Sequence, residues 1–370
     1  MNAPLDGIRV LDFSTLLPGP MASLILAEAG ADVIKIEHPD GGDGLRSYEP
    51  RWGDDSASFS MLNRGKKSLA IDLKRPETRD RLIPLIRETD ILLEQFRPGV
   101  MDRLELGYGD LVKIKPDLIY CTITGYGQTG PKRHQAGHDL NYIGDAGLLS
   151  LSMGRQDRPV VPPALIADIA GGSYPAVMNI LLALRHRDQT GEGAFLDISM
   201  TDNLFPFVFW ALGAGQITGQ WPSNGEGDLA GGSPRYQLYP TGDGEVLAVA
   251  ALEEKFWTAF CDTIDLDRPF RNDAADPGAT RQAIAEIISS KPSDDWRRLF
   301  DQADCCCTIV QSIEQAVSDV HFQERGLFDA RLEGPDRIDM AALPVPIAKA
   351  FRAEPEIAKS APALGSYDVA

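Results

Sequence analysis

The sequence has too few cysteines, in the wrong pattern, for a disulfide framework or a structural zinc site. Its five cysteines are Cys121, Cys261 and the run Cys305, Cys306 and Cys307, which contains no CxxC pair. Because zinc-ligand spacing is also missing, we expect no disulfides and no metal. This cysteine usage fits a reducing compartment, and we expect a cytoplasmic protein.

Long apolar runs and positive charge are scarce as well. The most apolar stretch that we find, 204–214, is too short to span a bilayer. The first residues, MNAPLDGIRVLDF, lack the basic start and apolar core of a secretory signal, and the last, SYDVA, form no targeting tripeptide. The net charge of −18 repels nucleic acid and anionic membranes, so we expect neither as a partner.

The sequence has the pattern of an α/β protein. Its 370 residues exceed the usual size of one domain, so we expect two lobes. β-Rich runs alternate with helical ones from the start, which predicts a doubly wound, mostly parallel sheet with ligands beyond its strand ends. Strands are predicted at 8–13, 32–37, 68–73, 91–95 and 118–124, and helices at 21–29 and 76–88.

The second half begins with a long apolar helix, predicted over 169–187 with a kink at Pro175. The stretch 219–234 is dense in Gly, Pro, Ser and Asp, which is typical of a linker. A smaller lobe is expected to begin there. Its predicted elements are strands at 235–239 and 246–250 and helices at 253–262, 280–289 and 294–302, and an aromatic helix at 204–214 precedes the linker.

Two segments of the first half indicate a ligand site. Residues 64–97 carry nine basic against six acidic side chains, which suits an anionic ligand, although a solvated helix face at 75–88 accounts for about half of these charges. The motif GYGQTG matches GxGxxG, but Pro131 follows it where a dinucleotide site needs a helix. We interpret it as a tight loop at a strand end, of the kind that borders ligand clefts.

Four residues are acid–base candidates, and each has a structural alternative. His138 has Asp139 beside it to hold its tautomer, yet a single histidine is more often structural than catalytic. Asp168 stands at a helix start, where Asp is a favoured N-cap, yet its apolar neighbours would raise its pKa. Glu253 and Glu254 follow a predicted strand, at a helix start where surface glutamates are common.

Ten segments of the chain together resemble the family III CoA-transferase superfamily, and in particular its racemase branch, the α-methylacyl-CoA racemases. Their collinear agreement over most of the chain is far more specific than any single motif. The segments are LDGIRVLDFSTLLPGP, LAEAGADVIKIEHP, NRGKKSLAIDLK, FRPGVMDRLELGY, TITGYGQTGP, AGHDLNYI, DIAGG, TGEGAFLDISM, GGSPRYQLYPTGDG and AALEEKFW.

The resemblance implies a Rossmann-like large domain with a doubly wound parallel sheet, formed by 1–200 and 311–370, and a smaller α+β domain at 225–310. Proteins of this kind are homodimers whose subunits interlock like chain links. The active site would lie between the large domain of one subunit and the small domain of the other. No cofactor is implied beyond the coenzyme A moiety of the acyl-CoA substrate.

The resemblance also assigns roles to single residues. It makes His138 and Asp168 catalytic, with Glu253 as a supporting acid. It implies an arginine at a coenzyme A contact where this chain has His38, which would weaken the hold on the phosphate at neutral pH unless Lys35 or a lysine at 66 or 67 substitutes. The other coenzyme A contacts map onto Leu16, Ile71, Leu73, Lys74, Arg97, Gly137 and Tyr142.

These roles imply an isomerase of lipid metabolism that inverts the α-carbon of a 2-methylacyl-CoA. One of His138 and Asp168 would remove the α-proton, and the other would return a proton to the opposite face. The rival within the superfamily is acyl-CoA:carboxylate CoA transfer, with Asp168 as nucleophile. His138 favours racemisation, because transfer needs no second acid–base group. A catalytically idle CoA-binding dimer is a third interpretation, and the acyl group leaves no readable pattern.

Overall fold

The protein is described by a computed structural model that covers residues 3–75, 77–152, 154–155, 158–333, 339–352 and 360–368. The chain forms two compact units. The first consists of Met1–Ala146, Ala164–Pro206 and Val320–Ala370, and the second of Gly147–Pro163 and Phe207–Asp319. The second unit contains the predicted 225–310 and extends beyond it, and it includes 147–163, which the sequence analysis placed in the large domain.

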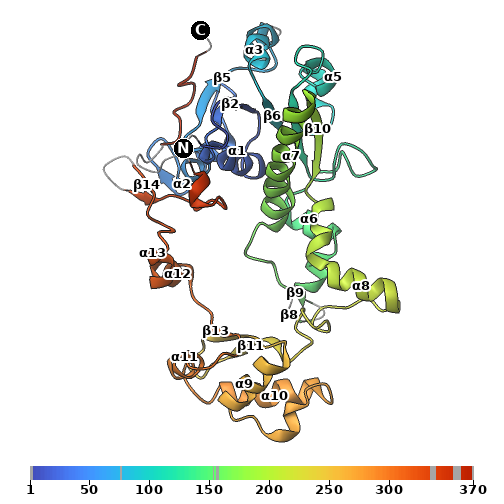
Figure 1. The fold of residues 1–370 in the computed structure, drawn as a ribbon, viewed down its shortest axis with the longest axis vertical. Helices are drawn as coiled ribbons and strands as arrows, with labels where there is room; N and C mark the ends of the chain where they lie inside the picture. Colours follow the sequence, from blue (N-terminus) through green and yellow to red (C-terminus); the bar gives the residue numbers. More distant parts are fainter. Residues whose placement is uncertain are drawn as a thin grey trace. The chain divides into compact units, whose positions relative to one another are not determined.

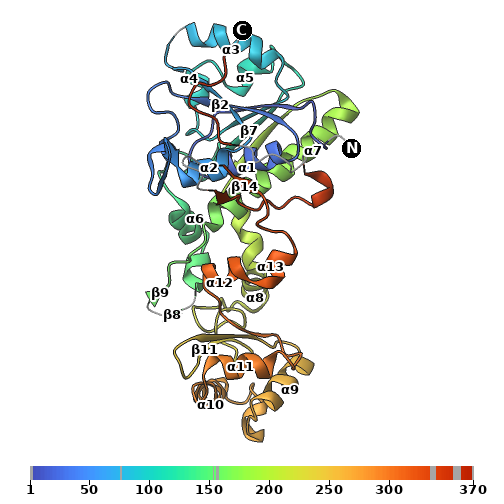
Figure 2. The ribbon, with the colours of Figure 1, turned by 90° about the vertical axis from the view of Figure 1, so that its left-hand side faces the viewer.

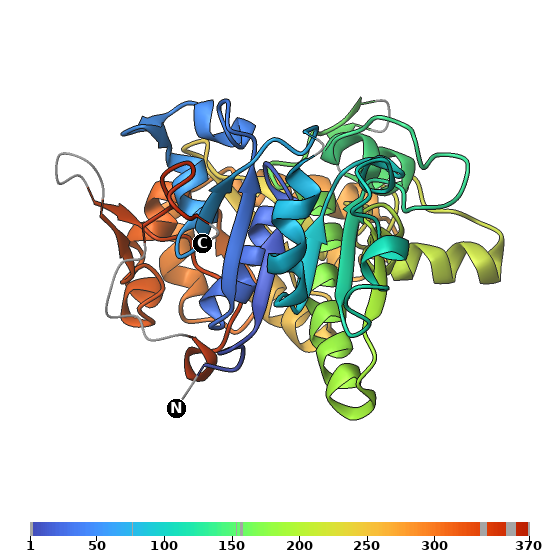
Figure 3. The ribbon, with the colours of Figure 1, turned by 90° about the horizontal axis from the view of Figure 1, so that it is seen from above.

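A six-stranded parallel sheet forms the centre of the first unit, in the order β10-β7-β6-β1-β2-β5. The prediction of a doubly wound parallel sheet is confirmed. The strand order reverses between β1 and β6, and ligands of such sheets bind beyond the carboxyl ends of the strands at this point. The strands, side by side in Figure 3, are β1 (Arg9–Asp12), β2 (Asp32–Glu37), β5 (Lys67–Ala70), β6 (Ile91–Glu94), β7 (Ile119–Thr124) and β10 (Ala194–Ser199).

Helices cover both faces of this sheet, which explains why its strands are nearly continuous apolar runs. Leu11, Ile34 and Leu92 on the central strands have no exposed surface. Figure 2 shows α3, α4 and α5 on one face and α1, α2 and α7 on the other. Their bounds are α1 (Pro18–Glu28), α2 (Ala57–Asn63), α3 (Glu77–Arg87), α4 (Val100–Arg103), α5 (Tyr108–Leu111) and α7 (Tyr174–Thr190), and the start predicted for α3, Pro76, lies outside the described residues.

The predicted helix 169–187 consists of two elements. A π-helical segment, η3 (Ala167–Ser173), precedes α7, and such segments are frequent at functional sites. Pro175 lies in the first turn of α7, where the π-helical segment passes directly into an α-helix. Asp168 belongs to the first turn of η3, and the N-cap position expected for it is held by Ile166.

The combined helix Ala167–Thr190 is long and apolar enough, by length and composition alone, to cross a membrane. The helix has 24 residues and contains an 18-residue window of mean hydropathy 1.2. Half of this window is buried inside the structure. The helix packs on β7 and β10, as the core helix of a folded lobe does.

The second unit is built on an antiparallel sheet in the order β11-β12-β13, and Figure 1 shows it beside α9, α10 and α11. Trp257, Phe260, Trp296 and Phe300 form the aromatic centre of its core. The predicted helix 204–214 is divided between a 3-10 helix, which contains Pro206, and an α-helix that begins at Phe209. The 3-10 helix η4 (Asp202–Val208) crosses the boundary between the units, which falls after Pro206. The elements that follow are α8 (Phe209–Thr218), β11 (Tyr236–Pro240), β12 (Val246–Ala250), α9 (Glu254–Thr263), α10 (Pro277–Ile288), α11 (Ser293–Phe300) and β13 (Cys307–Ile309).

Short elements complete the two units. A hairpin of two-residue strands precedes α2, and the helix α6 lies between β7 and η3. The remaining bounds are η1 (Gly44–Ser47), β3 (Arg51–Trp52), β4 (Asp55–Ser56), α6 (Asp139–Asp145), η2 (Leu148–Leu151), β8 (Gly154–Arg155), β9 (Arg158–Pro159), η5 (Arg268–Arg271), α12 (Ile313–Ser318), α13 (Val320–Glu324), β14 (Arg331–Leu332), β15 (Met340–Ala341) and η7 (Lys349–Phe351).

Candidate active site

Two cavities of the first unit lie at the carboxyl ends of the parallel strands, near the reversal of strand order. The first, of about 240 Å³, is lined by residues that follow β1, β6 and β7 together with His138 and Asp168. The second, of about 450 Å³, is lined by residues that follow β1, β2, β5 and β6. Phe96, just after β6, lines both cavities. The site is therefore where the topology of the sheet predicts a ligand.

The two acid–base candidates of the large domain meet in the first cavity. His138 is exposed and precedes α6, and its backbone N–H donates to the side-chain oxygen of Asn141 at 3.0 Å. Asp168 is half-buried in η3, and its backbone N–H donates to Asp139 at 2.9 Å. This hydrogen bond links Asp168 to Asp139, the residue next to His138.

The ionisation of Asp168 is shifted by its surroundings. Burial is the largest cause, and the negative charge of Asp139 adds to it, while His138 acts in the opposite direction. The result raises the pKa of the Asp168 carboxyl to about 6. A carboxyl group with such a pKa exchanges protons close to neutral pH, which suits a general acid or base.

Tyr142 forms one wall of the first cavity and depends on two glycines. Its hydroxyl donates to the carbonyl oxygen of Gly137 at 2.5 Å. A Cβ added to Gly137 would lie 2.6 Å from the tyrosine ring, and one added to Gly125 would also collide with it. The glycines at 125 and 137 are therefore required for the ring to lie where it does.

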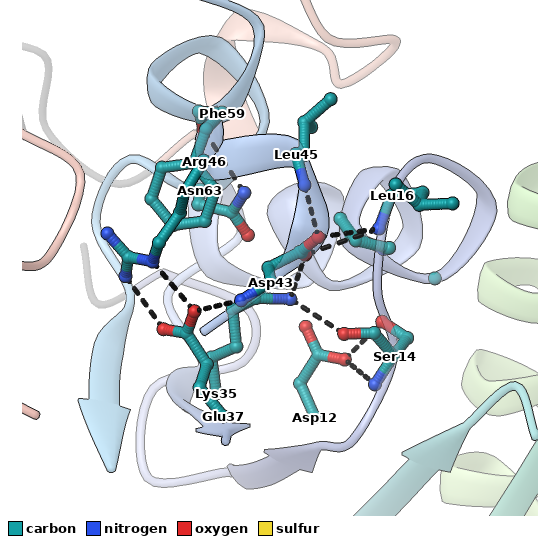
Figure 4. Close-up of polar contacts among 12 residues, drawn as sticks. Asp12, Ser14, Leu16, Lys35, Glu37, Asp43, Leu45, Arg46, Phe59 and Asn63 are labelled. Atoms are coloured by element: carbon teal, nitrogen blue, oxygen red, sulfur yellow. Dashed lines mark hydrogen bonds and ion pairs between the residues drawn. The ribbon is translucent and has the colours of Figure 1, made fainter. Parts of the chain in front are cut away.

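Leu16 reaches the first cavity from a strained loop that a buried polar network supports (Figure 4). Its φ of +63° is in the left-handed region, which is uncommon for leucine. The backbone N–H of Leu16 donates to Asp43 at 3.1 Å, and Asp43 pairs with Lys35 at 2.9 Å. Lys35 also donates to the carbonyl oxygen of Ser14 at 2.7 Å. Asp43 and Lys35 thus fix the backbone of the loop at Ser14 and Leu16.

The structure contradicts the expectation that Lys35, Lys66 or Lys67 holds a coenzyme A phosphate. Lys35 is fully buried in its pair with Asp43. Lys66 is also buried, donating to the carbonyl oxygen of Pro20 at 2.9 Å, and burial lowers its pKa to about 7. Lys67 stands at the amino-terminal start of β5, away from the carboxyl ends, and its ammonium pairs with Asp32 at 2.6 Å.

The second cavity contains a basic residue that the sequence analysis missed. Arg103, from the short helix α4, lines it together with His38 and Lys74. The signal was available, because Arg103 follows Arg97 by six residues in the segment FRPGVMDR. Its position on a helix beside the cavity could not be read from the charge count alone.

The predicted coenzyme A contacts divide between the two cavities. Ile71, Leu73, Lys74 and His38 line the second. Leu16, Arg97, Gly137 and Tyr142 line the first. The basic segment 64–97 is not one patch, because Arg64 is buried and bonded to Glu28 at 2.9 Å.

Glu94, which the sequence analysis did not single out, is the last residue of β6. It lies two residues before Phe96, which lines both cavities. Its carboxylate accepts the backbone N–H of Phe96 at 2.7 Å, and burial raises its pKa to about 7. On the neighbouring strand β7, Thr122 is paired with Glu94, and the Thr122 hydroxyl forms a hydrogen bond with the Glu94 carboxyl group. The same hydroxyl accepts a hydrogen bond from the side-chain amide of Gln128 at 2.8 Å. The GYGQTG segment therefore follows the end of β7 and borders the first cavity, and Gln128 bonds it to the sheet.

Glu253 and Glu254 belong to the second unit. Glu254 forms an ion pair with Arg235 at 2.9 Å, and Arg235 also binds Asp273. Glu253 is the exposed N-cap residue of α9. Arg235 thus distinguishes the two acids, since it engages only Glu254. Across the described parts of both units no cluster of His, Cys, Asp or Glu has the arrangement of a metal site.

Comparisons with known proteins place this arrangement in a family. The model of CoA-transferase family III matches residues 5–367. The α-methylacyl-CoA racemase of Homo sapiens is 36% identical over 329 residues, which is 88% of this chain and 82% of that protein. The acetyl-CoA:oxalate CoA-transferase of Acetobacter aceti is 34% identical over 317 residues, 82% of this chain and 79% of that protein. Racemases and transferases therefore match at similar identity.

A solved structure has the same fold. The crystal structure of a CAIB/BAIF family protein from Brucella suis superposes with a TM-score of 0.82 at 27% identity. The match covers 99% of this chain and 97% of that one.

Proposed function

We propose that this chain, which belongs to CoA-transferase family III, inverts the α-carbon of a 2-methylacyl-CoA thioester. The observation that carries the proposal is that His138 and Asp168 line one cavity. Inversion needs one group to remove the α-proton and a second to supply a proton from the other side. A CoA transfer needs a nucleophile and no such second group.

The ionisation of Asp168 supports this use of the pair. With a pKa of about 6, the carboxylate form predominates at neutral pH and the protonated form is still accessible. Asp168 can then act as the base for one epimer and as the acid for the other, while His138 takes the complementary role. Glu253 is proposed as the supporting acid, because Glu254 is engaged by Arg235.

The coenzyme A moiety is proposed to bind along both cavities. Lys74 and Arg103 supply positive charge in the second cavity, and Arg97 does so in the first. Arginine and lysine are the usual partners of phosphate groups. Ile71 and Leu73 offer an apolar wall to the rest of the moiety.

A homodimer is proposed for the working enzyme. Helix α7 leaves Met178, Leu181 and Leu182 exposed, at 61%, 46% and 67% of their surface. Three neighbouring large apolar side chains on one helix favour burial against another protein surface.

The alternative is acyl-CoA:carboxylate CoA transfer, in which the Asp168 carboxylate attacks the thioester carbonyl and displaces the coenzyme A thiolate. The similarity to an oxalate CoA-transferase favours it. In this reaction Asp168 alone makes a covalent bond, and His138 has no required role.

Two substitutions test the choice, with (R)- and (S)-2-methylacyl-CoA in deuterated water as substrates. His138→Ala should lower racemisation by about 10² to 10⁴-fold, yet leave α-hydrogen exchange from one epimer through Asp168. Asp168→Ala should leave exchange only from the other epimer. Chiral analysis and mass spectrometry measure the two quantities.

Matched controls are His134→Ala and Asp188→Ala, which remove exposed side chains of the same types that line neither cavity. Both should behave as the wild type. Full racemisation by His138→Ala would refute the two-base assignment. CoA transfer to a free carboxylate, lost only in Asp168→Ala, would establish the alternative.

A further inference from the structure

Thr124, the last residue of β7, has a hydroxyl group that is buried and unused. The residue is 7% exposed, and its Oγ1 has no hydrogen-bond partner within the part of the chain that the structure describes. Thr124 lines the first cavity together with His138 and Asp168. A buried hydroxyl without a partner costs stability, and such groups in folded proteins call for an explanation.

Thr122, on the same strand, has a hydroxyl group whose hydrogen bonds are made within the protein. It lies two residues earlier and therefore on the same face of the sheet. Its hydroxyl accepts from Gln128 at 2.8 Å and bonds to Glu94. The backbone carbonyl oxygen of Thr124 has a partner, since it accepts from the N–H of Met200 at 2.8 Å. The side-chain hydroxyl of Thr124 has no such partner among the described residues, and the residue lines the first cavity.

The proposed reaction develops charge that such a hydroxyl would stabilise. When the base removes the α-proton, the C–H electron pair forms a C=C bond and the carbonyl π pair moves to the thioester oxygen. The oxygen becomes an enolate, and a positioned donor lowers the energy of this state. Tyr142 is poorly placed to serve, because its hydroxyl already donates to Gly137.

We propose that the Thr124 hydroxyl donates a hydrogen bond to the thioester oxygen of the acyl-CoA and holds the enolate that forms there. This role rests on the proposed racemase function. Thr124 keeps its own proton throughout, and the α-proton moves only between the substrate and the pair His138 and Asp168. Binding of the acyl group thereby gives the buried hydroxyl the acceptor that the folded protein does not provide.

The test compares Thr124→Val, which replaces the hydroxyl by a methyl group of similar size, with Thr124→Ser, which keeps it. Thr124→Val should lower kcat for racemisation and α-hydrogen exchange by about 10² to 10³-fold, with KM nearly unchanged. Thr124→Ser should stay within a few-fold of the wild type.

Thermal unfolding separates this role from a structural one. Thr124→Val should melt no lower than the wild type, because no folded-state hydrogen bond is lost. Thr122→Val should melt lower, because it strips a partner from Glu94 and Gln128. A lower melting temperature for Thr124→Val would mean that the hydroxyl is structural and would overturn the inference.

The kinetic outcomes are distinct for the two proposals. Wild-type rates in Thr124→Val would overturn the role of Thr124 and leave the racemase function standing. Absence of any α-hydrogen exchange in the wild-type enzyme would overturn both.

Discussion

At the scale of single residues, the ionisation of Asp168 makes the clearest prediction. Its folded pKa of about 6 should appear as an acid limb in the pH profile of the reaction. The profiles of the two epimers must run parallel, because the ratio of their kcat/KM values is the equilibrium constant of epimerisation, which does not change with pH. For both epimers kcat/KM should therefore fall together as the pH drops below about 6, where the Asp168 carboxylate becomes protonated. Initial rates from each pure epimer between pH 5 and 8 measure this.

Asp139 provides the control for that prediction. Its charge raises the pKa of Asp168. Asp139→Asn removes the charge and keeps an oxygen for the Asp168 N–H, so both pH limbs should move to lower pH. Limbs that stay in place in this variant would mean that another group produces them.

At the scale of elements, the loop after β1 depends on a buried ion pair. Lys35→Met would leave the Asp43 carboxylate, which is fully buried, without its cation. Breaking such a pair costs about 3 to 5 kcal/mol of the free energy of unfolding. Leu16 would lose support as well, so KM for acyl-CoA should rise. Urea unfolding and steady-state kinetics measure the two effects.

Lys67→Met is the matched control, because Lys67 forms a half-exposed pair with Asp32 on the neighbouring strand. Exposed pairs contribute about 1 kcal/mol or less. Equal destabilisation by the two substitutions would contradict the importance assigned to the buried pair.

Two strands predicted from runs of β-forming residues have nearly the boundaries that we expected. The strand predicted at 32–37 is observed at those residues, and that at 118–124 begins one residue later. The π-helical segment η3 was missed, because its hydrogen bonding departs from the period that sequence patterns reveal. It also depends on close approach to another segment, since a Cβ added to Gly171 would collide with the carbonyl oxygen of Met200.

At the scale of the whole molecule, the exposed face of α7 predicts assembly. Met178 and Leu182 are four residues apart and share one face of the helix. The double variant Met178→Glu and Leu182→Glu should be monomeric by analytical ultracentrifugation, because two charges would have to be buried in the interface. It should also lose racemisation if the working enzyme is a dimer.

Tyr48→Glu, at an exposed apolar position outside α7, should leave the sedimentation coefficient unchanged. A double variant that sediments like the wild type would show that this face is not the interface.

The sequence by itself determined the parallel sheet, the family and the acid–base candidates, because strand alternation and collinear motifs are local properties of the chain. It could not determine which cations are free to bind a ligand. Lys35 and Lys66 look like surface charges in the sequence and are buried in the fold. Only the tertiary structure decided this, because burial depends on neighbours far along the chain.

The residue types at the site can be read from the sequence, but their ionisation and hydrogen bonding also depend on neighbours that only folding brings together. Asp168 is identified by its motif, but its pKa is set by burial and by Asp139, which lies beside it only in the folded chain. The hydroxyls of Thr122 and Thr124 are equivalent in the sequence. Folding gives the first its partners and leaves the second at the cavity without one among the residues described, since hydrogen bonds of side chains are made across strands and loops.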